Sequence, residues 1–226
     1  MRYSDVVPAT FLDRPNRFIA DILVDGAVQR CHVKNTGRCR ELLVPGAKIW
    51  VQRCGGQDRK TAFDLVTVRK GERLINVDST APNVVCREWL EGDVLGELSL
   101  IKREQSHGDS RFDFYYEGQG RRGYAEVKGV TLEEDNVVRF PDAPTQRGVK
   151  HLNGLIRCVQ EGYEACALFV IQMQGVQYFE PNRRTHPEFA DALMQAQSAG
   201  VKLFAIDCRV TENEITPGEP VEIRLG

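Results

Sequence analysis

Two carboxylates and one amine in the second half of the chain have the types and spacing that suit chemistry on a phosphate ester: Asp113, Glu126 and Lys128. In a strand the side chains alternate faces, so Glu126 and Lys128 are expected on one face and Val127 on the other. An acid and a lysine fixed side by side on a buried sheet are costly unless they bind something. A divalent cation together with a phosphate satisfies both.

The acid-x-lysine tripeptide carries little information by itself. It occurs twice in the chain, and the other copy, Asp58-Arg59-Lys60, follows a glycine pair in an expected turn. Glu126-Val127-Lys128 is therefore informative only together with the residues around it.

The position of Asp113 supplies that context. It lies between two phenylalanines, thirteen residues before Glu126, and Gly118, Gly120 and Gly123 mark a hairpin turn between the two acids. On paired antiparallel strands the acids lie opposite each other, with Cβ atoms about 5 Å apart, and repel unless a cation lies between them. Across a hairpin in an α-β-β-β-α-β order, this is the arrangement of PD-(D/E)xK nucleases. An ordinary cross-strand charge cluster on a solvated sheet face is the alternative.

A helix is expected after the hairpin, from Asp142 as its N-cap to Gln160. Apolar residues recur on it at helical spacing, at Val149, Leu152, Ile156 and Val159. The opposite side carries basic residues that are expected to contact a nucleic-acid backbone: Arg147, Lys150, His151 and Arg157. The other interpretation of this stripe is a solvated helix face.

The expected cofactor is Mg²⁺ or Mn²⁺, because carboxylate oxygens suit these ions. Asp113 and Glu126 are the expected ligands, and the backbone carbonyl of Val127 is a further candidate. Glu88, on a helix expected over residues 83–95, is a candidate third acid in competition with neighbouring acids. The four histidines are far apart in the sequence, which disfavours zinc catalysis.

Residues 1–80 are expected to form one domain and residues 81–226 a second. The first has short β-rich runs cut by turn residues, at 17–24, 28–33, 48–53, 62–69 and 74–77. Five such strands favour a small closed barrel, for which an OB fold is the commonest choice. The second domain mixes helices at 83–95, 142–160 and 186–198 with strands at 99–102, 112–116, 123–130, 165–172 and 201–206, as an α/β unit does.

A basic group surrounds one turn of the predicted barrel. It consists of Arg14, Arg17, Lys34, Arg38 and Arg40. With Phe18, His32 and the turn residues Asn35 and Thr36 it is expected to offer a surface for phosphates and bases. The alternative of equal weight is that Asn35-Thr36-Gly37 is simply a tight turn held by side-chain hydrogen bonds.

Composition places the chain among ordinary cytoplasmic proteins. The 226 residues carry 30 basic and 32 acidic side chains, so contact with a nucleic acid must come from local patches and not from a global field. The seven cysteines are odd in number and form no Cys-x-x-Cys, which argues against a disulfide framework. Neither a signal peptide nor a membrane span is expected.

The chain resembles the sugar fermentation stimulation protein A (SfsA) family over nearly its whole length. The matching segments include His32-Val-Lys-Asn-Thr-Gly37, Ser110-Arg-Phe-Asp-Phe114, Ala125-Glu-Val-Lys-Gly-Val-Thr-Leu132, the thirteen residues 140–152, and 195–201. The resemblance implies an N-terminal OB fold, a C-terminal PD-(D/E)xK nuclease-like domain, DNA binding with little sequence preference, and a regulatory link to sugar (maltose) metabolism.

One departure from the nuclease pattern is Phe112, which stands where the motif has proline before Asp113. That proline supplies no ligand, so metal binding is expected to be kept. A literal Pro141-Asp142 lacks a following acid-x-lysine and is interpreted as a helix start. The leading hypothesis is a Mg²⁺-dependent nuclease acting on DNA, with RNA not excluded. The alternative is a non-catalytic DNA-binding regulator with the same fold. A dimer is an open option for the assembly.

Overall fold

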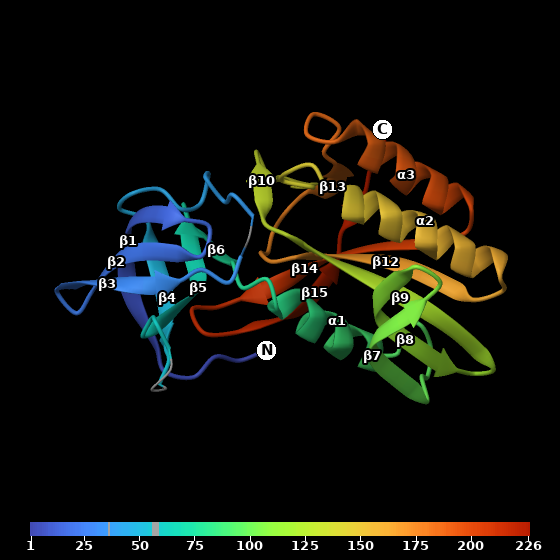
Figure 1. Cartoon of the computed structure of the whole chain (residues 1–226), viewed down its shortest axis with the longest axis horizontal. Helices are drawn as coiled ribbons and strands as arrows, with labels where there is room; N and C mark the ends of the chain where they lie inside the picture. Colours follow the sequence, from blue (N-terminus) through green and yellow to red (C-terminus); the bar gives the residue numbers. More distant parts are fainter. Residues whose placement is uncertain (36, 56–58) are drawn as a thin grey trace.

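The computed structural model describes residues 1–35, 37–55 and 59–226. Its N-terminal part is built from six strands (Figure 1): β1 (Val6–Asn16), β2 (Ile19–Val24), β3 (Ala27–His32), β4 (Lys48–Arg53), β5 (Phe63–Lys70) and β6 (Arg73–Asn76). Their order is β3-β2-β1-β4-β5-β6, and an additional parallel pairing of β3 with β5 closes five of them into a ring. The predicted OB-type barrel is confirmed.

The sequence pattern missed the first strand of this barrel. The missed strand, β1, contains Pro8 and Pro15, and its pairing with β2 shifts register twice, between Phe11 and Asp13 and again before Asn16. Proline and bulges disturb the alternation on which strand recognition depends. The expected strand at residues 74–77 exists as β6, but it extends the edge of β5 and does not close the ring.

A second, mixed sheet forms the centre of the C-terminal part, in the order β15-β14-β12-β9-β8-β7. Its strands are β7 (Leu100–His107), β8 (Ser110–Gly118), β9 (Arg121–Val130), β12 (Glu164–Ile171), β14 (Lys202–Val210) and β15 (Ile215–Pro220). The helix α1 (Ala81–Glu91) lies on one face, while α2 (Gln146–Gln160) and α3 (Pro187–Ser198) lie together on the other (Figure 1). Together these elements form the expected α/β domain.

A small four-stranded sheet lies beside the main one and was not expected from the sequence. It consists of β10 (Leu132–Glu134), β11 (Val137–Phe140), β13 (Tyr178–Pro181) and β16 (Glu222–Ile223). Strands of two to four residues are too short to show a periodic pattern.

The start of α2 differs from the prediction. Thr145 is the N-cap, and its hydroxyl accepts a hydrogen bond from the Gly148 amide at 3.0 Å. Pro144 disfavours a helical conformation at the residue before it, so the helix cannot include the segment that precedes Pro144. Asp142, the predicted cap, instead accepts a hydrogen bond from the Arg38 amide of the barrel at 3.1 Å.

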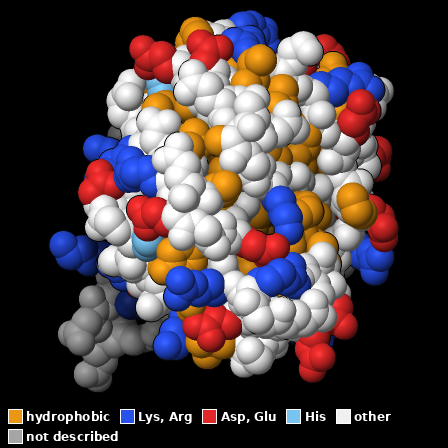
Figure 2. Space-filling model, turned by 90° about the vertical axis from the view of Figure 1, so that its right-hand side faces the viewer, with side chains coloured by type: hydrophobic (Ala, Val, Ile, Leu, Met, Phe, Trp, Pro, Cys, Tyr) orange, Lys and Arg blue, Asp and Glu red, His pale blue; other side chains and the backbone are white. Residues whose placement is uncertain are grey.

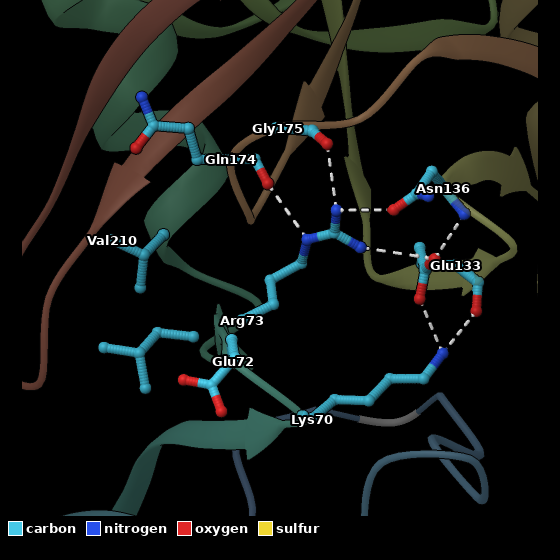
Figure 3. A pocket seen from close by; sticks show the side chains of 10 residues that line it. Lys70, Glu72, Arg73, Glu133, Asn136, Gln174, Gly175 and Val210 are labelled. Carbon is cyan, nitrogen blue, oxygen red and sulfur yellow. Dashed lines mark hydrogen bonds and ion pairs between the residues drawn. The ribbon is translucent and has the colours of Figure 1, made fainter.

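Polar contacts of Arg73 and Lys70 hold the barrel against the second domain (Figure 3). Arg73 donates to the carbonyl oxygens of Gln174 and Gly175, at 3.0 and 2.9 Å. The buried carboxylate of Glu133 accepts from Lys70 at 2.6 Å and pairs with Arg73 at 3.2 Å. These contacts link the turn between β5 and β6 to the small sheet.

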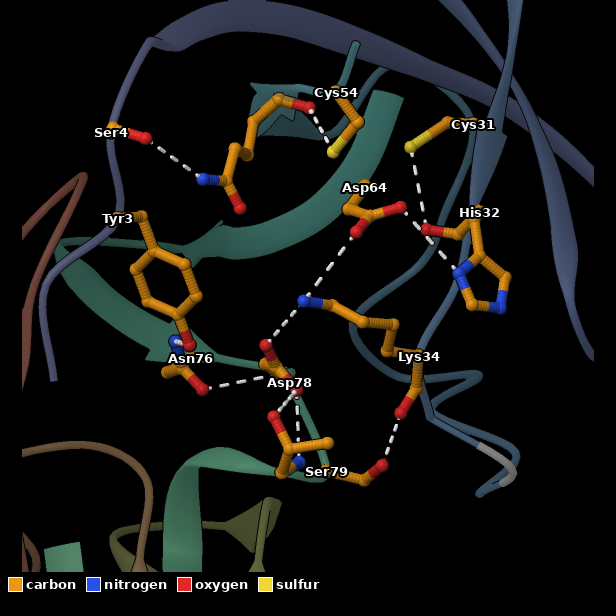
Figure 4. Close-up of polar contacts among 12 residues, drawn as sticks. Tyr3, Ser4, Cys31, His32, Lys34, Cys54, Asp64, Asn76, Asp78 and Ser79 are labelled. Atoms are coloured by element: carbon orange, nitrogen blue, oxygen red, sulfur yellow. Dashed lines mark hydrogen bonds and ion pairs between the residues drawn. The ribbon is translucent and has the colours of Figure 1, made fainter. Parts of the chain in front are cut away.

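A second set of polar contacts lies at the segment 76–79, which links the two domains (Figure 4). The ammonium of Lys34 lies 2.7 Å from the fully buried Asp78 and 3.6 Å from Asp64. The side-chain amide of Gln172 donates to the carbonyl oxygens of Asn76 and Asp78, at 3.1 and 3.0 Å. The barrel loop after β3 is therefore fixed next to the start of α1.

The seven cysteines are free thiols, and six of them are buried. Among the described residues, no helix is both long and apolar enough to cross a membrane.

Candidate active site

Asp113 and Glu126 meet at a fork in the main sheet. The β8–β9 ladder runs from Gly118 and Arg121 to Phe114 and Ala125, and the next residue on each strand is one of the two acids. Beyond this point β8 continues to pair with β7, while β9 pairs with β12. The hairpin and its register match the prediction as far as Phe114 and Ala125, and the two strands separate at the acids that follow.

The backbone is irregular on the β8 side of the fork. Phe112 packs in the core beneath α2, whereas Phe114 packs in the core beneath α1, although residues two apart on a regular strand share a face. Opposite Asp113, Glu104 of β7 has φ of +54°. The irregularity turns the Asp113 side chain toward β9.

Asp113 is held by two hydrogen bonds. Its Oδ2 accepts from the Val127 amide at 2.8 Å, and its Oδ1 accepts from the side-chain amide of Asn83 on α1 at 3.2 Å. Burial and the neighbouring Glu126 charge raise the pKa of Asp113, and the bond from Val127 only partly offsets them. The site therefore disfavours two negative charges in the absence of a cation.

Glu126 is 3% exposed, and its two oxygens differ. Its Oε1 is contacted by Lys128 Nζ and by His151 Nδ1. Its Oε2 is buried without a hydrogen-bond partner among the described residues. Burial alone would raise the pKa of Glu126, but the hydrogen bonds from His151 and Lys128 outweigh burial and lower the pKa. The carboxylate is thus ionised with one oxygen engaged and one left over.

These acids line an open cavity of about 270 Å³. Its walls also include Asn83, Lys128 and Arg147, as well as Ser79 and Pro82 beside the start of α1 and Thr145, the N-cap of α2. The amino ends of two helices carry partial positive charge, which favours an anionic group in this cavity. A larger cavity, of about 740 Å³, lies between the domains around Arg73, but the cations there are already paired with Glu133.

The donors fit an oxygen-seeking cation that keeps several waters. Within residues 1–35, 37–55 and 59–226, no three His, Cys, Asp or Glu side chains are grouped as a metal site. Two carboxylates alone are the usual protein contribution to a Mg²⁺ site. The unpartnered Oε2 of Glu126 is the oxygen that such an ion would take. The Val127 carbonyl stays a predicted ligand, because the contact that the structure shows between Val127 and Asp113 is made by the Val127 amide.

Glu88 is not part of the site, which corrects its candidacy as a metal ligand. Its Oε1 accepts from the N-terminal ammonium at 3.0 Å, and it is absent from the cavity wall. The α1 residue that reaches the acids is Asn83, which the sequence did not single out. No local sequence pattern identifies Asn83, because it lies thirty residues before Asp113.

The four basic positions predicted on α2 have different surroundings. Arg147 lines the cavity, whereas Lys150 lies 3.5 Å from Asp109 on the solvent side and Arg157 pairs with the same carboxylate. His151 is 6% exposed and contacts Glu126, so it is not a surface residue that meets a nucleic acid directly.

The cause is the rotation of α2 about its own axis. Its buried face is formed by Gly148, His151, Leu152, Gly154, Leu155 and Cys158, while the predicted Val149, Ile156 and Val159 are only half-buried. A Cβ on Gly154 would come within 2.9 Å of the Phe112 ring. This close approach of helix and sheet brings His151 to Glu126, and a pattern of apolar residues does not reveal it.

Among the residues predicted to contact nucleic acid in the barrel, Lys34 and Asn35 are engaged in holding the fold. Lys34 is paired with buried acids, as described above, and Asn35 Oδ1 accepts from the Gly37 amide at 2.8 Å, as the tight-turn interpretation requires. Arg17 and Arg38 are exposed, and the Arg17 guanidinium lies over the Phe18 ring. Thr36 and Asp58 lie outside the described residues.

On the face of the molecule shown in Figure 2, Lys and Arg side chains are interspersed with Asp and Glu. They do not gather there into a patch of one sign. This agrees with the formal net charge of -2.

Comparisons with known proteins cover both parts of the chain. A family model described as the SfsA N-terminal OB domain matches residues 12–77, and one described as the sugar fermentation stimulation protein RE domain matches residues 80–214. The sugar fermentation stimulation protein homolog of Desulfitobacterium hafniense (strain DSM 10664 / DCB-2) is 54% identical over 225 residues, covering 100% of this chain and 99% of its own. The homolog of Clostridium beijerinckii is 50% identical over 226 residues and covers 100% of both chains.

A similar solved structure is that of Pyrococcus furiosus SfsA in complex with Ca²⁺. It is 27% identical, has a TM-score of 0.87, and the match covers 99% of this chain and 98% of that one. The likeness therefore extends over both domains.

Proposed function

The chain belongs to the sugar fermentation stimulation protein family, and we propose that it is a metal-dependent nuclease that hydrolyses phosphodiester bonds in DNA with little sequence preference. The observation that carries the proposal is the pair of carboxylates at the fork, where Glu126 keeps one buried oxygen without a partner among the described residues, and burial together with the Glu126 charge raises the pKa of Asp113. Both features are relieved by a divalent cation. The Ca²⁺ complex of the Pyrococcus furiosus relative supports a cation in this family.

Asp113 and Glu126 would hold Mg²⁺ or Mn²⁺. When bound, the ion supplies polarisation of the scissile phosphate and a water of lowered pKa. Lys128, whose Nζ contacts Glu126 Oε1, would orient a water or offset charge on the phosphate. Asn83 and the Val127 amide fix the Asp113 carboxylate, so that it does not turn away from Glu126.

The phosphate would be held by Arg147 and by the amino ends of α1 and α2, all of which border the cavity. These contacts are to the backbone of a nucleic acid and carry no base information, in keeping with little sequence preference. Because contacts to phosphates release counterions, we expect binding to weaken as ionic strength rises, and the slightly negative overall charge makes it weak at cellular salt. The cytoplasm is the proposed location, and a regulatory link to sugar metabolism is the physiological part of the proposal.

The second candidate is a DNA-binding regulator that does not cleave. The observation that favours it is that Lys128 already neutralises Glu126 and His151 contacts the same carboxylate oxygen, so that the cluster is satisfied on one side without metal. Such a protein would retain DNA in a salt-sensitive manner and release no products at any metal concentration.

The deciding experiment is a cleavage assay on single- and double-stranded DNA and RNA with Mg²⁺, Mn²⁺ or EDTA. Wild type is compared with Asp113→Asn and Glu126→Gln, and Glu88→Gln is the matched control, an acid that contacts the N-terminus and lies outside the cavity. We expect metal-dependent products from wild type and Glu88→Gln only. Absence of products from the wild-type protein, alongside a clear gel shift, would replace the nuclease with the regulator.

A further inference from the structure

The proposed nuclease chemistry gives His151 no role, although it is the most buried polar residue of α2 and contacts Glu126. Its Nδ1 contacts Glu126 Oε1, and its Nε2 lies 3.4 Å from the Arg147 Nε. The ring is 6% exposed and meets the Phe112 ring edge-on, with ring centroids 6.2 Å apart. Packing therefore leaves the imidazole little freedom to turn.

The two neighbours determine which nitrogen carries the proton. Glu126 is an ionised acceptor, so Nδ1 must be the donor, and the guanidinium of Arg147 can only donate, so Nε2 must accept. His151 in the Nδ1–H form satisfies both. The result is one continuous chain of contacts from Arg147 through His151 to Glu126 and on to Lys128.

This chain has a consequence for Glu126. A carboxylate that had only Lys128 as a partner would be free to rotate and present either oxygen to the flexible ammonium. With His151 on the same Oε1, the carboxylate plane is fixed, and Oε2 is left as the oxygen that has no partner in the described part of the chain. Partners of this kind orient ligands and commonly change metal affinity by roughly 10- to 100-fold.

The other end of the chain acts on Arg147. This side chain is exposed and lines the cavity, and long flexible side chains lose conformational entropy when they bind. The His151 Nε2 engages its Nε, which keeps the side chain beside the cavity.

We propose that His151 is a positioning residue with two separable tasks: its Nδ1 orients Glu126 for the divalent cation, and its Nε2 holds Arg147 for the phosphate. The inference rests on the proposed function for the site. It adds that the cation and phosphate sites are coupled through one imidazole.

Two substitutions separate the tasks, because the side-chain amide of Asn reaches the place of Nδ1 and that of Gln reaches the place of Nε2. His151→Asn keeps a donor for Glu126 and loses the acceptor for Arg147. His151→Gln keeps the acceptor and loses the donor. Ca²⁺ affinity is measured by calorimetry on the metal-free protein, and DNA affinity by fluorescence anisotropy with saturating Ca²⁺, so that neither readout requires turnover.

We expect a crossed pattern. His151→Gln should weaken Ca²⁺ binding by roughly tenfold or more. His151→Asn should leave Ca²⁺ binding near wild type and weaken DNA binding by about tenfold, the size of one charge-assisted hydrogen bond. His107→Gln is the matched control, since His107 pairs with Glu161 at 2.9 Å outside the cavity, and it should change neither affinity.

Parallel losses of both affinities in the two variants, tracking a lower melting temperature, would show a merely structural histidine and overturn the inference. Unchanged affinities in both variants would overturn it as well. In either case Ca²⁺ binding that is lost in Glu126→Gln would leave the cation site itself standing. If wild type binds no Ca²⁺, both the inference and the nuclease proposal fail, whereas a crossed pattern without cleavage would remove the nuclease proposal alone.

Discussion

The Val127 amide donates a hydrogen bond to Asp113 Oδ2 at 2.8 Å, across the gap where β8 leaves β9. A side chain thus takes the acceptor position that a neighbouring strand usually supplies. The bond fixes the carboxylate beside Glu126 and also connects the two strands where their ladder ends, so that a proposed metal ligand contributes to the sheet.

Asp113→Asn should stabilise the metal-free protein at neutral pH. The pKa of Asp113 is raised by burial and by Glu126, so the stability contributed by this group is complete below its unfolded pKa and is lost as pH rises through its folded pKa. Asn keeps the acceptor for Val127 and removes the charge. We expect a gain on the order of 1 kcal/mol at pH 7.5, which shrinks below about pH 4. Urea unfolding in EDTA at both pH values measures it, and a loss of stability at pH 7.5 would contradict the prediction.

Glu126→Gln should have the opposite effect on the same metal-free protein. The pKa of Glu126 is lowered, because its hydrogen bonds from His151 and Lys128 outweigh burial, so its stabilisation is present above the unfolded pKa and lost as pH falls through the folded pKa. We expect a loss of about 1–3 kcal/mol at pH 7 that diminishes in acid. The same unfolding series tests it, and a loss that stays constant with pH would rule out the charge as its cause.

Arg147→Ala and Lys150→Ala should differ, although the two residues are three positions apart on one helix. Arg147 lines the cavity, whereas Lys150 pairs with the exposed Asp109. We expect Arg147→Ala to lower kcat/KM for DNA cleavage by roughly tenfold or more, and Lys150→Ala to change it by less than about twofold. Equal losses would show that the whole basic side of α2 meets the substrate.

Lys34→Met should weaken the fold and not merely DNA binding. The ammonium is the partner of Asp78, which is fully buried, and removing one member of a buried pair costs about 3–5 kcal/mol. Arg38→Ala is the comparison, since its exposed guanidinium lies in the same loop. Thermal melts should show a large drop for Lys34→Met and almost none for Arg38→Ala. A DNA-binding defect in Lys34→Met at unchanged melting temperature would restore Lys34 to the binding surface.

The sequence by itself determined the local features of this protein. Turn residues and alternating strands predicted a barrel followed by an α/β domain, and the glycines between Asp113 and Glu126 placed the two acids opposite each other. Such features depend on residues close together in the chain, whose spacing sets the register directly. The strand β1 was missed for the same reason, since prolines and bulges disrupt its local pattern.

Only the tertiary structure decided which other residues surround the acids. Asn83 arrives from α1, Glu88 turns away to the N-terminus, and His151 reaches Glu126 because Gly154 lets α2 approach the sheet closely. These contacts join segments far apart in the chain. They depend on how helices rotate and pack against the sheet, and close packing is a property of shape that hydrophobic periodicity does not encode.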